Sequence, residues 1–192
     1  MLVLDIHPLT PQRWDDLVQL FGERGAFGGC WCMWWRQTAA EFDRSAGPGN
    51  RAALQGIVEE GRVPGLLGYV DDQPVGWCSV APRQEFGRLQ RSPILKPVDD
   101  HPVWAIVCFF VHRRQRRRGV ASELLQGAVD HARRQGARIV EGYPVETGPK
   151  RAAAASLYTG TVSLFREAGF HEVARRSDSR PIMRLALEAG GT

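Results

Sequence analysis

The sequence predicts a mixed α/β fold: a central, mostly antiparallel sheet, helices on both of its faces, and one parallel β-α-β unit. The segment Val103–Val111 is apolar on both faces, which is typical of a strand in the middle of a sheet. An amphipathic helical pattern follows to about Gln135, and the strand Arg138–Tyr143 comes next, an order that implies a right-handed parallel crossover. Two strands at hairpin spacing, Leu66–Val70 and Pro74–Ala81, add antiparallel pairing.

The segments before the hairpin predict one strand and three helices. Leu2–His7 alternates as a strand does. Thr10-Pro11 predicts a helix start, with threonine as the N-cap and proline as the first helical residue. Thr38-Ala39-Ala40-Glu41 has the form of a capping box and predicts a short helix. A third helix is expected from Arg51 to Glu60, ending near Gly61.

The segments after the hairpin complete the pattern. Pro82–Pro102 is a long irregular connection, which indicates a functional loop. Beyond the parallel unit we expect a loop, a helix that begins early within the alanines of that loop, and two strands. These segments are Pro144–Ser156, Leu157–Ala168, His171–Arg176 and Pro181–Leu187.

Length and composition predict one soluble domain over residues 1–192, with 43% hydrophobic and 24% charged residues. No apolar run approaches the roughly 20 residues of a membrane span, so no membrane partner is expected. The N-terminus lacks the basic and long apolar regions of a secretory signal. The four cysteines are expected to be reduced, and together these features predict a cytoplasmic protein.

The positive charge is concentrated at one turn. The net charge is +4, from 25 basic and 21 acidic residues, and five arginines lie between Arg113 and Arg118. Without them the balance is 4 − 5 = −1, so the rest of the chain is close to neutral. Proteins that coat nucleic acid usually spread positive charge over a face. The pattern therefore favours a compact anion and no nucleic-acid partner.

The turn joins the apolar segment that ends at Val111 to the start of the amphipathic helix. Gly119 and Ala121 leave the backbone uncovered where that helix begins. Exposed amide N–H groups and the positive helix end there favour a phosphorylated ligand. A solvated charge run is the alternative, and the small residues argue against it.

The turn also resembles a known family. Arg116-Arg117-Arg118-Gly119-Val120-Ala121 is similar to the Gln/Arg-x-x-Gly-x-Gly/Ala signature of the GNAT superfamily of N-acetyltransferases, and the element order and Leu164–Phe170 agree with that family. The resemblance implies acetyl-coenzyme A as acyl donor, with no metal. It places the pyrophosphate on the amides of Arg116, Arg117, Arg118, Gly119, Val120 and Ala121. It places the pantetheine arm along Cys108, Phe109, Phe110 and Val111, with Tyr158 as a further contact. The Cys108 side chain itself is expected to be a small core residue rather than a nucleophile.

The catalytic residues are less well defined. Phe165 stands where many members of the family have a tyrosine that protonates the departing thiolate. Tyr158 is the alternative acid, and a buried tyrosine that anchors the helix start is an equal possibility. Glu141, Glu146 and Glu85 are candidate bases, although a solvated surface acid is the simpler interpretation of each.

The segment Cys30–Arg36 is dense in aromatic residues. The resemblance implies that this region lines the acceptor side, where Trp31, Trp34 and Trp35 stack on a substrate and Arg36 pairs with a carboxylate. A core plug is the alternative of comparable weight. Zinc is not expected, because no second cysteine pair with ligand spacing is present.

The sequence thus predicts an N-acetyltransferase that transfers an acetyl group directly to a primary amine, more readily a small molecule than a protein. One alternative is an acyl-coenzyme A sensor of the same fold with little catalysis, which Phe165 favours. Another is a nucleic-acid binder that uses the arginine turn. A homodimer is left open.

Overall fold

The computed structural model describes residues 4–147 and 157–188. Within them the chain forms one seven-stranded sheet in the order β1-β2-β3-β4-β5-β7-β6. Every neighbouring pair is antiparallel except β4 and β5, which are parallel. The predicted mixed, mostly antiparallel sheet is therefore confirmed.

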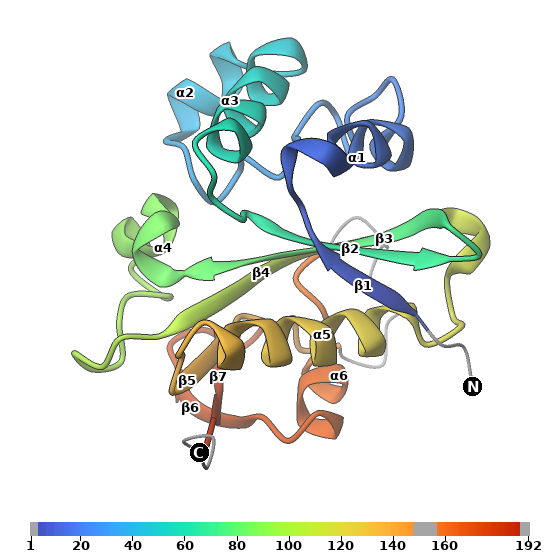
Figure 1. Ribbon diagram of the computed structural model, residues 1–192. Helices are drawn as coiled ribbons and strands as arrows, with labels where there is room; N and C mark the ends of the chain where they lie inside the picture. Colours follow the sequence, from blue (N-terminus) through green and yellow to red (C-terminus); the bar gives the residue numbers. More distant parts are fainter. Residues whose placement is uncertain (1–3, 148–156, 189–192) are drawn as a thin grey trace.

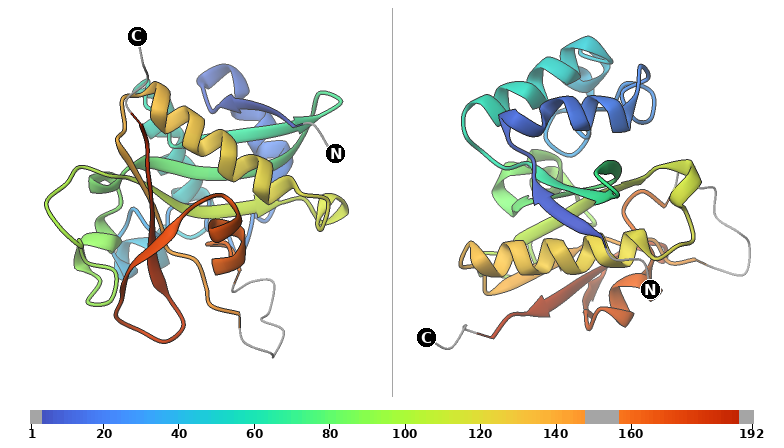
Figure 2. Two further views of the ribbon diagram at one scale, coloured as in Figure 1. Left: turned by 90° about the horizontal axis from the view of Figure 1, so that it is seen from below. Right: turned by 45° about the vertical axis from the view of Figure 1, so that its right-hand side comes forward.

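Helices cover both faces of this sheet (Figure 1). The helices α1 to α4 lie on one side, and α5 and α6 lie on the other, as the side view in Figure 2 also shows. Each face has its own hydrophobic core, one packed under α1, α3 and α4 and the other under α5 and α6. None of the helices within the described ranges is both long and apolar enough to cross a membrane.

The antiparallel half of the sheet contains the predicted hairpin. Its strands are β1 (Asp5–Pro8), β2 (Gly65–Val70), β3 (Gln73–Pro82) and β4 (Trp104–Val111). Asp71 and Asp72 form the turn between β2 and β3, with φ of 48° and 60°. Two-residue hairpin turns take this left-handed backbone because it matches the twist of the strands, and aspartate tolerates it.

The first helical layer agrees with the prediction in part. It consists of a short 3₁₀ turn (Pro11–Arg13), α1 (Trp14–Phe21), α2 (Ala39–Arg44) and α3 (Pro48–Glu59). The capping box of α2 is confirmed: Glu41 N donates to Thr38 Oγ1 over 3.2 Å, and Thr38 N donates to Glu41 Oε2 over 2.8 Å. Thr10 precedes the first helical turn as expected, but its side chain makes no capping hydrogen bond.

Two predicted boundaries in this half were wrong. The third helix begins at Pro48 and not at Arg51, because proline at the first helical position has its φ already set and lacks an N–H that would be unpaired there. The connection Pro82–Pro102 is not irregular throughout. It contains a 3₁₀ turn (Arg83–Glu85) and the short helix α4 (Gly87–Arg91).

The parallel unit is confirmed. β4 leads through the turn into α5 (Val120–Arg134), and β5 (Ile139–Gly142) then pairs in parallel with β4. A bulge interrupts β4, because Cys108 pairs with Ser79 while Ile106 pairs with the next residue of β3. Because Val107 is the extra residue, its side chain and that of Cys108 both lie in the core under α1. The side chains of Ile106 and Phe109 face α5 on the other side of the sheet.

The C-terminal part begins later than predicted. α6 spans Val162–Glu167 and not Leu157–Ala168, and β6 (His171–Arg175) and β7 (Pro181–Ala186) follow. Thr161 determines the start of α6, since its hydroxyl accepts a hydrogen bond from Leu164 N over 3.2 Å. The alanines in which the helix was expected to begin lie outside the described residues.

Candidate functional site

The arginine-rich turn presents a run of unpaired backbone donors at the start of α5. Arg117 and Gly119 take left-handed backbone, with φ of 63° and 84°. Gly119 is the N-cap of α5, and its carbonyl accepts from Ser122 N and Glu123 N. In contrast, each backbone N–H from Arg116 to Ala121 donates to no group of the described residues. These amides and the positive helix end form a ready anion site.

The side chains of the turn add uncompensated positive charge. Arg113, Arg114, Arg116, Arg117 and Arg118 are all exposed. Arg118 Nη1 donates to a neutral glutamine 2.8 Å away, and Arg116 Nε donates to the Val111 carbonyl over 3.3 Å. None of the five forms an ion pair with an acid in the described part of the chain. Their charge therefore remains available to an external anion.

The edge of β4 opens beside this turn. β5 pairs with β4 from Trp104 to Ile106, and no residue pair of these strands follows within the described residues. Beyond that point Phe109 N donates to the Tyr158 carbonyl over 2.5 Å, and Val111 O accepts from Arg116. The backbone groups predicted to pair with pantetheine are thus partly satisfied by the chain itself, as an exposed strand edge requires.

These features match a known family. A family model described as the acetyltransferase (GNAT) family matches residues 30–160. The chain belongs to this family. No curated protein matches the sequence.

Solved GNAT structures have the same fold as this chain. A GNAT-family acetyltransferase from Streptococcus agalactiae 2603 is 15% identical with a TM-score of 0.58, covering 96% of each chain. The paia N-acetyltransferase from Thermoplasma acidophilum, solved with coenzyme A, is 11% identical with a TM-score of 0.55, covering 96% of this chain and 99% of that one. A ribosomal-protein-alanine N-acetyltransferase from Brucella melitensis is 18% identical with a TM-score of 0.54, covering 96% of this chain and 100% of that one. At these identities the likeness concerns the fold alone.

In this GNAT fold Tyr158 lies between the β4 edge and the aromatic segment. Its carbonyl bonds to Phe109 of β4, and its ring packs on Trp35 with centroids 6.5 Å apart. Burial raises the pKa of its hydroxyl further above neutral, which keeps the proton in place and makes the group a weaker acid than a free tyrosine. That hydroxyl makes no hydrogen bond to another described residue. Tyr158 as an acid stays a prediction, and its position and protonation are compatible with that role.

The residue at the usual tyrosine position belongs to the core. Phe165 is fully buried and meets Phe109 and Phe170 edge to face, with centroids 6.2 Å and 5.0 Å away. The ring also occupies the space beside Gly142, where a Cβ would lie within 3 Å of it. Phe165 therefore packs against Phe109 of β4 and has no proton to donate.

Cys108 contacts other thiols rather than a base. Cys32 Sγ donates to Cys108 Sγ over 3.3 Å, and Trp77 Nε1 donates to Cys32 Sγ over 3.0 Å. The hydrogen bond to Cys108 and burial raise the pKa of Cys32. All four cysteines are free thiols. Within the described residues, no cluster of three or more His, Cys, Asp or Glu is arranged to hold a metal ion.

Glu141 is the centre of a buried ion network. The side chain is fully buried, and Arg184 Nε donates to its Oε2 over 2.6 Å. Tyr143 donates its hydroxyl to Oε1 over 2.6 Å, and Arg83 Nε lies 3.4 Å from the same oxygen. Arg184 also pairs with Asp99. Both carboxylate oxygens accept hydrogen bonds and are shielded from solvent, so the structure does not support the prediction that Glu141 is a base.

The other two candidate bases are also paired with arginines. Glu146 is exposed, and its Oε2 lies 2.9 Å from Arg175 Nη2. Glu85 Oε2 accepts from Arg36 over 2.8 Å and from Arg62 over 2.7 Å. A carboxylate bound to a guanidinium is a poorer proton acceptor, because accepting a proton would break the ion pair. No free carboxylate is found where the sequence predicted a base.

The aromatic segment divides between core and surface. Trp31 and Trp35 are 4% and 6% exposed, and Trp31 packs on Trp14 and Phe21. Trp34 is 36% exposed, and the Arg88 guanidinium carbon lies 3.7 Å from its ring centroid. The core plug thus describes two of the three tryptophans. The substrate contacts predicted for them remain predictions.

The Arg36 side chain is buried and forms an ion pair inside the protein. Its side chain is 4% exposed, it pairs with Glu85, and its guanidinium lies 4.6 Å from the centroid of the Phe86 ring. Arg36 was predicted to pair with a carboxylate of the substrate, and in the structure it pairs with Glu85 of the chain instead. The sequence offered no sign of this, since Glu85 is 49 residues away.

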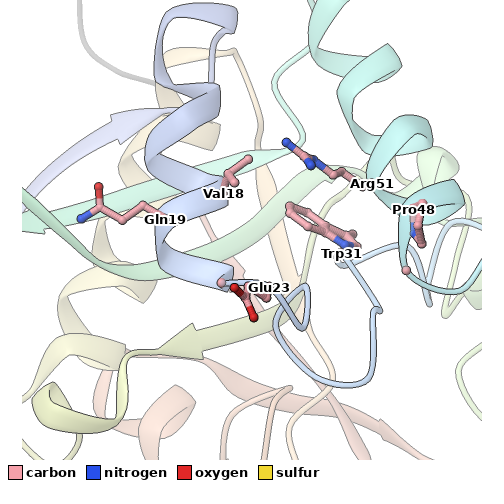
Figure 3. A pocket seen from close by; sticks show the side chains of 8 residues that line it. Val18, Gln19, Glu23, Trp31, Pro48 and Arg51 are labelled. Carbon is pink, nitrogen blue, oxygen red and sulfur yellow. The ribbon is translucent and has the colours of Figure 1, made fainter.

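Two cavities of the described residues lie in the helical layer. Trp31, one of the predicted acceptor contacts, lines one of them, and the sequence did not predict the other. The larger, of about 440 Å³, lies between α1 and α3 and is lined by Val18, Gln19, Gly22, Glu23, Trp31, Gly47, Pro48 and Arg51. Figure 3 shows the Arg51 side chain beside the Trp31 ring, with Glu23 on the α1 side. The smaller, of about 310 Å³, is lined by Thr38, Ala39, Arg88, Arg91 and Ser92. Its arginines come from α4, within the segment that looked irregular in the sequence.

Proposed function

We propose that this protein is an N-acetyltransferase that moves an acetyl group from acetyl-coenzyme A directly to a primary amine, with a small-molecule acceptor favoured over a protein. The observation that carries the proposal is the run of unpaired N–H groups from Arg116 to Ala121 at the start of a 15-residue helix. Buried or partly buried donors without a partner are costly, whereas these face the surface and fit a diphosphate. The five exposed arginines around them add charge of the required sign.

The residues present fit the rest of the coenzyme. Beyond Ile106, no strand of the described residues pairs with β4 on its β5 side, and Phe109 and Val111 present backbone groups there. An extended ligand with amides pairs with such an edge as an added strand does. In our proposal the pantetheine arm takes over the bonds that Phe109 and Val111 now make with Tyr158 and Arg116.

The coenzyme supplies the acetyl group as a thioester, and the chain supplies its orientation and a proton. Tyr158 is the residue we assign to proton donation, because it lies beside the β4 edge and its protonated hydroxyl has no hydrogen-bond partner among the described residues. In our proposal the rings of Trp35 and Tyr158, whose centroids lie 6.5 Å apart, form part of the acceptor side. The acceptor amine would arrive deprotonated or lose its proton to water, because Glu85, Glu141 and Glu146 are all held by arginines.

The sensor of the same fold is the second candidate, and a specific observation favours it. The usual tyrosine is replaced by the buried Phe165, and each predicted base is ion-paired. A sensor needs the anion site and the β4 edge but no proton transfer. It therefore predicts the same coenzyme binding with no turnover.

Two measurements together test the proposal. Calorimetric titration with acetyl-coenzyme A measures binding, and release of free thiol is followed with a panel of primary amines. Binding with amine-dependent thiol release is the expected result. Binding with no release for any amine would favour the sensor, and absence of binding would refute both.

A further inference from the structure

The cavity between α2 and α4 is dominated by positive charge. Arg88 and Arg91 both line it, together with Thr38, Ala39 and Ser92. Neither arginine forms an ion pair within residues 4–147 and 157–188. Burial and the nearby charge of Arg91 lower the pKa of Arg88, and the charges of Tyr158 and Asp43 oppose that shift in part.

The Arg88 guanidinium is held in place and is incompletely bonded. Its Nε donates to the Trp34 carbonyl over 2.6 Å, and the group stacks 3.7 Å from the centroid of the Trp34 ring. Its Nη2 is buried and has no hydrogen-bond partner among the described residues. Seven other buried side-chain atoms of the described residues also lack a partner, so this donor gains its meaning from the cavity and the second arginine beside it. The fixed orientation means that an oxyanion would find this donor already in position.

The acids near the cavity do not fill that role. The Glu41 carboxylate is occupied by the capping box, where Thr38 donates to its Oε2 from both the backbone nitrogen and the hydroxyl. Asp43 lies close enough to affect Arg88 electrostatically but makes no ion pair with it. The remaining polar group, Ser92 Oγ, accepts from Leu95 N over 3.1 Å. Glu41 stays charged and lies close enough to Arg91 for that arginine to help lower its pKa, but it forms no ion pair with Arg88 or Arg91. The cavity thus offers guanidinium donors that no acid of the described residues pairs with.

One short segment connects the cavity to the β4 edge. Trp34 lies against Arg88, the next residue Trp35 packs on Tyr158, and Thr38 lines the cavity. Tyr158 in turn bonds to Phe109 of β4 through its carbonyl. The cavity therefore lies along the aromatic segment, and its Arg88 is close enough to Tyr158 for the two groups to influence each other's pKa.

We propose that this cavity binds a carboxylate or phosphate carried by the acceptor amine, so that the enzyme selects anionic small amines. The inference rests on the proposed acetyl transfer and names the substrate class of that site. A volume of about 310 Å³ suits the anionic end of a small molecule. Arg88 and Arg91 would bind the oxyanion while the amine reaches toward Tyr158.

Matched amines test the inference. Ethanolamine is neutral at its far end, β-alanine carries a carboxylate and O-phosphoethanolamine carries a phosphate, so comparison of their kcat/KM also separates the two anions. The wild type is expected to prefer at least one anionic amine over ethanolamine by about tenfold or more. Arg91→Gln is expected to remove most of that preference by lowering kcat/KM for the anionic amines.

Arg91 is the better position for the test, because Arg88 also holds Trp34. Arg44→Gln is the control: it removes the same charge from an exposed arginine of α2 that does not line the cavity. Titration of O-phosphoethanolamine into protein saturated with coenzyme A gives a second readout that needs no turnover. Binding that is lost in Arg91→Gln and kept in Arg44→Gln supports the inference.

The two failures are distinct. If ethanolamine is acetylated at least as well as both anionic amines, the inference is wrong and the proposed function stands. An unchanged preference in Arg91→Gln, or an equal loss in Arg44→Gln, also overturns the inference. If no amine in a broad panel releases thiol, the proposed acetyl transfer fails, and the substrate inference fails with it.

Discussion

Gly119→Glu places a negative charge in the proposed pyrophosphate site. Gly119 has φ of 84° and no atom within 4 Å of the position of a Cβ, so a side chain has room there. Only the left-handed backbone opposes it, at a cost of about 1–2 kcal/mol in stability. The variant should therefore fold, with a somewhat lower Tm.

The loss of coenzyme affinity should be much larger than this strain suggests. At an effective dielectric constant of about 20, two like charges about 6 Å apart repel by about 3 kcal/mol. That repulsion corresponds to about a 100-fold weaker Kd. The glutamate would also compete with the phosphates for the amides from Arg116 to Ala121.

Gly136→Glu provides a matched control at the other end of the same helix. Gly136 has φ of 83° and also has no atom within 4 Å of a Cβ. The two variants share the charge change and the backbone strain and differ only in position. Calorimetry with acetyl-coenzyme A should show near wild-type affinity for Gly136→Glu and a loss of about 100-fold for Gly119→Glu. Equal affinities in the two variants would remove the turn from the coenzyme site.

Three further predictions concern Tyr158 and the buried ions. Tyr158→Phe should lower kcat by about 100-fold or more and leave the KM for acetyl-coenzyme A unchanged; an unaltered kcat would exclude the hydroxyl as the acid. The Arg184 guanidinium lowers the pKa of Asp99 to about 2, so this pair stabilises the fold above about pH 4 and loses its contribution as the pH falls through about 2. The Tm difference between wild type and Asp99→Asn should therefore shrink over that range, and a constant difference would count against the ion pair. Glu141→Gln leaves buried arginines without their counter-ion and should cost about 3 kcal/mol in denaturant unfolding, whereas the exposed Glu146→Gln should cost less than about 1 kcal/mol; similar costs would contradict the assignment of Glu141 to the core.

Local rules in the sequence were sufficient for most of the fold. The apolar strand from Val103 to Val111, the helix pattern up to Gln135 and the strand that follows determine the parallel unit, because each has a clear period and a clear end. The arginine turn was recognised for the same reason, since glycine and alanine mark an exposed backbone at a helix start. Its unpaired amides in the structure are what that pattern predicts.

The rest depended on contacts between residues far apart in the chain. Nothing local shows that Arg36 pairs with Glu85, or that Glu141 is enclosed by Arg83 and Arg184. A glutamate at the end of a strand has the same sequence appearance whether it faces solvent or an arginine. The cavity with Arg88 was missed because a five-residue helix has too few positions to show a period.

The junction of β4 and β5 has a consequence for how the molecule opens. The strands meet over three described residue pairs, from Trp104↔Val140 to Ile106↔Gly142, so few backbone bonds hold the first four strands to the last three. The ion network around Glu141 spans this same seam. Solvent should therefore enter along the seam before the hairpin yields, and the amide protons of β5 and β7 should exchange with deuterium together, ahead of those in β2 and β3.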